Sequence, residues 1–140
     1  MPLRPDRKRR RIGILIALIG VSAIGGAIVR ETRQQQGQLE ARVTAMTGGD
    51  IARGRELFGS YGCGACHTIS GVPQAQGRVG PPLEGLNARA VIAGKLSNNP
   101  ANLQRWIHDP QAVSPGTAMP RLGVGEQDAR DLAAFIYSRS

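Results

Sequence analysis

The chain opens with a polar, basic segment and then runs through a long stretch that carries no charge. Residues 12–29 read IGILIALIGVSAIGGAIV and contain no charged, amide or aromatic side chain. Isoleucine and leucine fall on all faces of a helix built from this stretch, which argues against a helix buried in a soluble core. A helix of this length reaches about 27 Å, close to the hydrocarbon thickness of a bilayer. The pattern therefore predicts a transmembrane helix over residues 12–29.

Residues 30–49 are polar again and end on a Gly-Gly pair. Leu39, Val43 and Met46 recur at helical spacing within this segment. The segment is therefore either a helical stalk or a flexible tether. In both cases we expect it to act as a linker to the part of the chain that follows.

Residues 50–140 show helical periodicity in three places. Asp50 can cap a first helix whose buried face contains Ile51, Gly54, Leu57 and Phe58. The last segment repeats that spacing with Ala129, Leu132, Phe135 and Ile136. Another helix should begin after Asn99, with Pro100 in its first turn, and bury Leu103, Trp106 and Ile107. We therefore predict an all-α domain, in which Gly54 lets the first and last helices cross closely.

The positive charge of the chain is concentrated at its N-terminus. The net charge is +8, but residues 1–11 hold six basic groups against Asp6, whereas residues 50–140 hold nine basic and seven acidic groups. A basic leader before an apolar run is a membrane arrangement rather than a nucleic-acid-binding face. By the positive-inside rule, residues 1–11 are cytoplasmic and the domain lies on the periplasmic or extracytoplasmic side of the inner membrane.

A cleaved secretory signal is the alternative interpretation of this N-terminal part. Gly25 and Ala27 are small residues that could form a processing site. We favour an uncleaved, single-pass anchor, because the apolar run is longer than the usual ~7 to 15 residues of a signal peptide. The domain is exported under either interpretation.

The predicted domain is poor in large side chains for its size. Its aromatic residues are Phe58, Tyr61, Trp106, Phe135 and Tyr137, and the chain has no others. A domain of about ninety residues with so few large side chains has difficulty in building a sufficient core by itself. We therefore expect a bound group to complete the core.

The motif Cys63-Gly64-Ala65-Cys66-His67 indicates which group that is. Two cysteines followed at once by a histidine form the C-x-x-C-H pattern of covalent haem attachment. A disulfide or a thioredoxin-like redox pair would not need His67, and a zinc site would need a fourth ligand, for which His108 is the remaining imidazole. We therefore predict one covalent haem c, with His67 as an iron ligand.

A second axial ligand would come from His108 or Met119, unless the sixth position is open. Met119 lies in a loop flanked by proline and glycine, which can present a thioether away from any helix face. His108 ends a predicted helix and is more typical of a boundary residue. We favour Met119. Arg78, Arg121 and Trp106 lie near these segments and are candidates for contacts with the haem propionates.

Residues 50–140 resemble a class I cytochrome c. Besides the C-x-x-C-H motif, the family pattern is matched by Gly-Pro-Pro-Leu at residues 80–83, by Pro-Gly-Thr-Ala-Met-Pro at 115–120 and by the last predicted helix. Residues 102–113 resemble more particularly the cytochrome c domain fused to subunit II of some bacterial haem-copper oxidases. No copper-binding cupredoxin part precedes the domain, so we do not expect the chain to be that oxidase subunit.

The resemblance implies a class I cytochrome c fold around one haem and an electron-transfer role rather than catalysis. In the family, the proline of Gly-Pro accepts a hydrogen bond from the proximal histidine, which implies that Pro81 orients His67. The implied function is a membrane-tethered one-electron carrier between a quinol-oxidising complex and a terminal oxidase. A fixed haem-bearing subunit of a respiratory complex, or a haem peroxidase or sensor with a labile sixth position, are the alternatives.

Overall fold

A computed structural model describes residues 7–139 of the chain, so residues 1–6 of the predicted leader lie outside the described range. The chain divides into two compact units, one ending at Gln38 and one beginning at Leu39. The described residues are mostly helical, with one pair of two-residue strands, and the prediction of an all-α fold is confirmed.

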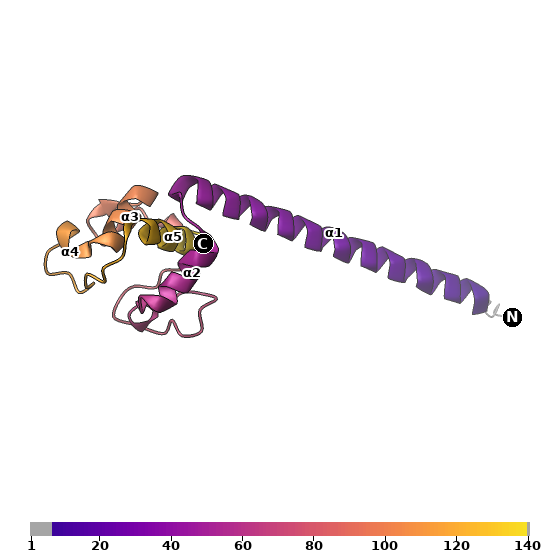
Figure 1. Cartoon of the computed structure of the whole chain (residues 1–140). Coiled ribbons are helices and arrows are strands. Elements are labelled where there is room, and N and C mark those ends of the chain that lie inside the picture. Colours follow the sequence, from indigo (N-terminus) through magenta and orange to yellow (C-terminus); the bar gives the residue numbers. More distant parts are fainter. Residues whose placement is uncertain (1–6, 140) are drawn as a thin grey trace. The chain divides into compact units, whose positions relative to one another are not determined.

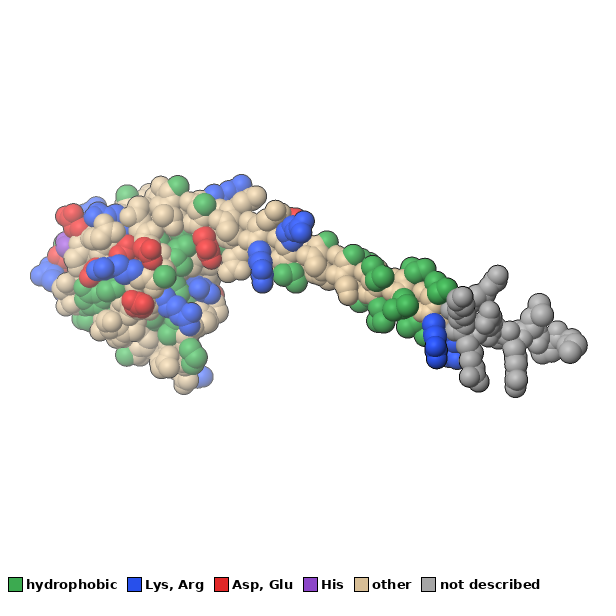
Figure 2. All heavy atoms as spheres, turned by 45° about the vertical axis from the view of Figure 1, so that its right-hand side comes forward, with side chains coloured by type: hydrophobic (Ala, Val, Ile, Leu, Met, Phe, Trp, Pro, Cys, Tyr) green, Lys and Arg blue, Asp and Glu red, His purple; other side chains and the backbone are tan. Residues whose placement is uncertain are grey.

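A single long helix, α1 (Arg7–Thr47), forms the N-terminal part of the chain (Figure 1). It contains the apolar stretch, whose large side chains are all exposed, from 48% at Val29 to 69% at Val21. Figure 2 shows these hydrophobic side chains on the N-terminal half of the helix, with arginine side chains beyond both ends of the apolar stretch. Within the described residues, α1 is the one helix long and apolar enough to cross a membrane.

The helix continues through most of the segment predicted as a stalk or tether. Its last residues belong to the second unit, where Val43 is 2% and Thr47 is 3% exposed. The Thr47 carbonyl accepts a hydrogen bond from Gln104 Nε2 at 2.8 Å. Gly48 then ends the helix with a φ of +67°, in the left-handed region that favours glycine after a helix. The part of the segment outside the globular unit is therefore shorter than residues 30–49.

The two helices predicted to cross closely do so. Helix α2 (Ile51–Ser60) begins at Asp50, whose carboxylate accepts the Arg53 N–H at 2.7 Å as an N-cap. Helix α5 (Glu126–Tyr137) crosses α2 at Gly54, where an added Cβ would collide with the Asp131 carbonyl. The rings of Phe58 and Phe135 meet edge to face, with centroids 5.7 Å apart.

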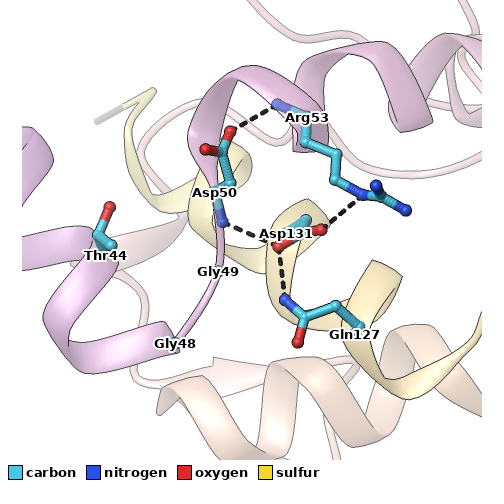
Figure 3. A pocket seen from close by; sticks show the side chains of 7 residues that line it. All are labelled: Thr44, Gly48, Gly49, Asp50, Arg53, Gln127 and Asp131. Carbon is cyan, nitrogen blue, oxygen red and sulfur yellow. Dashed lines mark hydrogen bonds and ion pairs between the residues drawn. The ribbon is translucent and has the colours of Figure 1, made fainter.

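Asp131 fixes the start of α2 against α5 (Figure 3). Its carboxylate is 1% exposed, and Oδ1 accepts hydrogen bonds from the Asp50 N–H at 2.8 Å and from Gln127 Nε2 at 2.9 Å. Its Oδ2 pairs with Arg53 Nε at 3.0 Å. The buried charge is therefore compensated by one cation and two further donors, as a buried carboxylate requires.

The rest of the second unit consists of short elements between α2 and α5. They are η1 (Cys63–Ala65), η2 (Leu86–Ala88), the antiparallel strands β1 (Val91–Ile92) and β2 (Leu96–Ser97), α3 (Pro100–His108) and α4 (Pro110–Val113). As predicted, Asn99 caps α3 by accepting the Asn102 N–H at 2.9 Å, and Pro100 occupies its first turn. Helix α5 supplies more of the buried core than any other element, and its Ala133, Ala134 and Phe135 are fully buried.

Candidate functional site

The two cysteines lie on a tight turn directly after α2. Gly62, with a φ of +68°, turns the chain into η1, and the Cys63 carbonyl accepts the Cys66 N–H at 3.2 Å and the His67 N–H at 3.0 Å. Both cysteines are free and half-buried, and burial raises the pKa of the Cys63 thiol to about 11. The turn brings both sulfurs and the His67 imidazole to the wall of one cleft.

The backbone of residues 80 and 81 orients the His67 ring. His67 Nδ1 lies 2.8 Å from the Pro81 carbonyl oxygen, and because a carbonyl only accepts, Nδ1 carries the proton. In the neutral imidazole, Nε2 then has a free lone pair, the form in which an imidazole binds a metal. Gly80 is required here, since an added Cβ would collide with the His67 ring.

The cleft has a volume of about 500 Å³. Its lining comes from α2, η1, η2, β1, α3, α5 and the loops at residues 79–83 and 117–122. Most of these side chains are apolar, among them Phe58, Leu86, Leu103, Trp106, Leu132 and Ile136. An apolar cleft with two thiols and an imidazole on its wall fits a covalently bound haem.

Met119 is half-buried and lines the same cleft, whereas His108 is not among its lining residues. His108 Nδ1 instead lies 2.6 Å from the Val124 carbonyl oxygen, outside the cleft. A zinc site would require His108 to lie beside Cys63 and Cys66. His108 does not line the cleft that these two cysteines line. Within residues 7–139, no group of three or more His, Cys, Asp and Glu side chains is placed to hold a metal ion.

The structure also separates the three candidates for propionate contacts. Trp106 lines the cleft, but Arg78 and Arg121 are not among its described lining residues. The arginine on the cleft is Arg89, which the sequence analysis did not single out. Its guanidinium donates to the carbonyls of Pro82 at 2.5 Å and Glu84 at 3.2 Å. Only the fold reveals this position, because no spacing rule links Arg89 to the C-x-x-C-H motif.

The cytochrome c family profile matches residues 51–140, the part of the chain that forms this cleft. The chain belongs to the cytochrome c family. The expected class I cytochrome c fold is therefore confirmed, and so is the cofactor, a covalently bound c-type haem. When bound, this haem supplies a metal centre that takes up and releases one electron.

This cytochrome c is similar to proteins of two kinds. Cytochrome c oxidase subunit 2 of Alkalihalophilus pseudofirmus is 38% identical over 87 residues, which cover 61% of this chain and 25% of the relative. The same subunit of a Bacillus species is 35% identical over 71 residues, or 49% of this chain and 20% of the relative. The chain thus spans a quarter or less of these two relatives.

The third relative is a cytochrome c2. That protein, from Rhodomicrobium vannielii, is 29% identical over 109 residues, or 69% of this chain and 84% of the relative. A search of solved structures finds no significant match. Membership of the family makes electron transfer the general role of the chain.

Proposed function

We propose that the chain is a membrane-tethered one-electron carrier whose haem iron is ligated by His67 and Met119. One observation supports this ligation most directly: the two side chains come from distant segments and line the same cleft. The Pro81 carbonyl accepts from His67 Nδ1, which in the neutral imidazole leaves Nε2 available to bind the iron. His67 and Met119 would hold the haem iron in both oxidation states, so that an electron would move with little rearrangement, and the thioether would raise the reduction potential.

We infer that residues 12–29 anchor the protein in the cytoplasmic membrane, with the haem domain on the periplasmic or extracytoplasmic side. The apolar part of α1 supports the anchor, and the basic residues before it support this orientation. A cleaved signal peptide would not require the helix to continue past the apolar stretch. Helix α1 does continue past it, to Thr47. Tethering confines the haem domain to the membrane surface, which raises its effective concentration near membrane-bound partners.

The proposed partners are a quinol-oxidising complex as electron donor and a terminal oxidase as acceptor. The relatives named cytochrome c oxidase subunit 2 support an acceptor of this class. The same similarity favours a second candidate function, a fixed haem-bearing subunit of a respiratory complex. Copurification with an oxidase in stoichiometric amounts, after mild detergent extraction, would identify the fixed subunit, and its absence the mobile carrier.

The proposed ligation is tested by absorption spectroscopy of the full chain, purified in detergent from cells competent in cytochrome maturation. The oxidised protein should show the weak long-wavelength band of iron–sulfur ligation, and Met119→Ala should abolish it. Met46→Ala is the matched control, because Met46 lies on α1 with 49% exposure and does not line the cleft. A band that persists unchanged in Met119→Ala would refute the ligation by Met119.

A further inference from the structure

The loop that carries Met119 is held by the side chain of a single glutamine. Gln111 Nε2 donates hydrogen bonds to the Thr117 carbonyl at 2.9 Å and to the Met119 carbonyl at 2.8 Å. Its Oε1 accepts the Gly116 N–H at 3.1 Å. We propose that Gln111 is a positioning residue that holds Met119 in place as the sixth ligand. This inference depends on the ligation proposed above.

The loop has little hydrogen bonding of its own. Among the described residues, the one backbone–backbone hydrogen bond within residues 114–121 joins the Thr117 N–H to the Ser114 carbonyl, at 3.1 Å. Proline at positions 115 and 120 offers no N–H, and Gly116 has a φ of +81°. The Gln111 side chain therefore supplies hydrogen-bond partners for the loop backbone, which in a helix or strand would come from other backbone groups.

The residue that holds the loop lies on a short helix that is itself capped and ion-paired. Gln111 lies in α4, which begins with the buried Pro110 and is capped by Asp109, whose Oδ1 accepts the Ala112 N–H at 3.0 Å. The Asp109 carboxylate also pairs with the guanidinium of Arg121, with a shortest distance of 2.6 Å. The loop is thus attached to residues 109–111 on both sides of Met119, and the attachment at the Met119 backbone itself is Gln111.

The physical consequence concerns how often Met119 leaves the iron. A foreign ligand can take the sixth position only while the thioether is away, so its apparent affinity is scaled by the fraction of open molecules. The Gln111 hydrogen bonds exist only in the closed loop and therefore reduce that fraction. Their loss should raise the open fraction without changing the intrinsic affinity of the iron for the foreign ligand.

The test is imidazole binding to the oxidised full chain, with wild type, Gln111→Ala and Gln111→Glu compared. Removing the hydrogen bonds should tighten apparent imidazole binding on the order of tenfold. Gln111→Glu has nearly the same shape but cannot donate to the two carbonyls, so it should resemble Gln111→Ala. Gln104→Ala is the matched control, since the Gln104 amide bonds to Thr47, outside the loop, and its imidazole affinity should equal that of wild type.

The two experiments distinguish a failure of the Met119 ligation from a failure of the proposed role of Gln111. If Met119→Ala keeps the iron–sulfur band of wild type, the ligation fails and the role of Gln111 falls with it. If Met119→Ala loses the band while both Gln111 variants bind imidazole as wild type does, the ligation stands and the role of Gln111 is overturned. A lower unfolding midpoint with unchanged imidazole affinity is also an overturning result, because it shows a merely structural role.

Discussion

At the scale of single residues, the site depends on how closely the backbone approaches the His67 imidazole. The Pro81 carbonyl reaches His67 Nδ1 because Gly80 has no side chain between them, and the Gly80 N–H is itself bonded to the Cys66 carbonyl at 2.8 Å. The Gly-Pro pair is thus both a spacer and an acceptor. A larger residue at position 80 would collide with the His67 ring and disturb both functions.

Gly80→Ala should therefore displace the His67 ring and weaken its bond to Pro81. We expect the free energy of unfolding of the haem-loaded protein to fall by about 1–3 kcal/mol, the usual cost of overpacking. Denaturant titration followed by haem absorbance would measure this change. Gly59→Ala is the control: Gly59 lies in α2 with no atom near its missing Cβ, so alanine there should be neutral or stabilising. Equal stability of the two variants would contradict the assigned role of Gly80.

At the scale of elements, polar contacts around one face join α2 and α5. Tyr61 follows α2, and its hydroxyl donates to Asp128 Oδ2 at 2.7 Å, while Arg53 Nη2 donates to Asp128 Oδ1 at 3.1 Å. These two hydrogen bonds, that of Tyr61 first, lower the pKa of Asp128. A carboxyl whose pKa is lower in the folded than in the unfolded chain adds stability only while it is ionised.

The contribution of Asp128 should be complete above the ordinary aspartate pKa of about 3.9 and should be lost as the pH falls through its lowered folded pKa. Asp128→Asn should remove that part of the acid sensitivity, so its stability should decline less steeply with falling pH below about pH 4 than that of wild type. Thermal midpoints measured from neutral to strongly acidic pH would show this. If the thermal midpoint fell equally with pH in wild type and Asp128→Asn, Asp128 would have the same pKa in the folded and unfolded chains, which would contradict this prediction.

At the scale of the whole molecule, the distribution of charge bears on how the protein would associate with the proposed electron-transfer partners. The positive excess lies in residues 1–11, while residues 50–140 carry nine basic and seven acidic groups. The haem domain, with its propionates, is therefore close to neutral. Strong electrostatic steering needs a strongly charged surface, so contacts around the cleft should dominate docking.

Association of the purified protein with the proposed acceptor, a terminal oxidase, should accordingly depend weakly on ionic strength. We expect the second-order rate constant of electron transfer to change by less than about threefold between ~0.05 and ~0.5 M salt, a range over which exposed charges become largely screened. Stopped-flow kinetics with detergent-solubilised partners would measure it. A steep fall with salt would show that a local cluster of charges, rather than the net charge, governs docking.

The sequence alone determined the features that depend on chemical identity and on local spacing. Cys63, Cys66 and His67 specify covalent haem because attachment is a reaction of neighbouring side chains, and Asp50 and Asn99 predict helix starts because capping acts over three residues. The apolar stretch at residues 12–29 likewise predicts a membrane helix from the sequence alone, because hydrophobicity is a property of each individual residue.

Only the tertiary structure decided which distant groups meet. It placed Arg89 on the cleft instead of Arg78 or Arg121, buried Asp131 beside Arg53, and brought Gln111 against the Met119 backbone. It also joined the last turns of α1 to the globular unit, where the polar pattern had predicted a linker. Such contacts arise from packing between elements, and a side chain that bonds to a backbone group far along the chain leaves no periodic signal in the sequence.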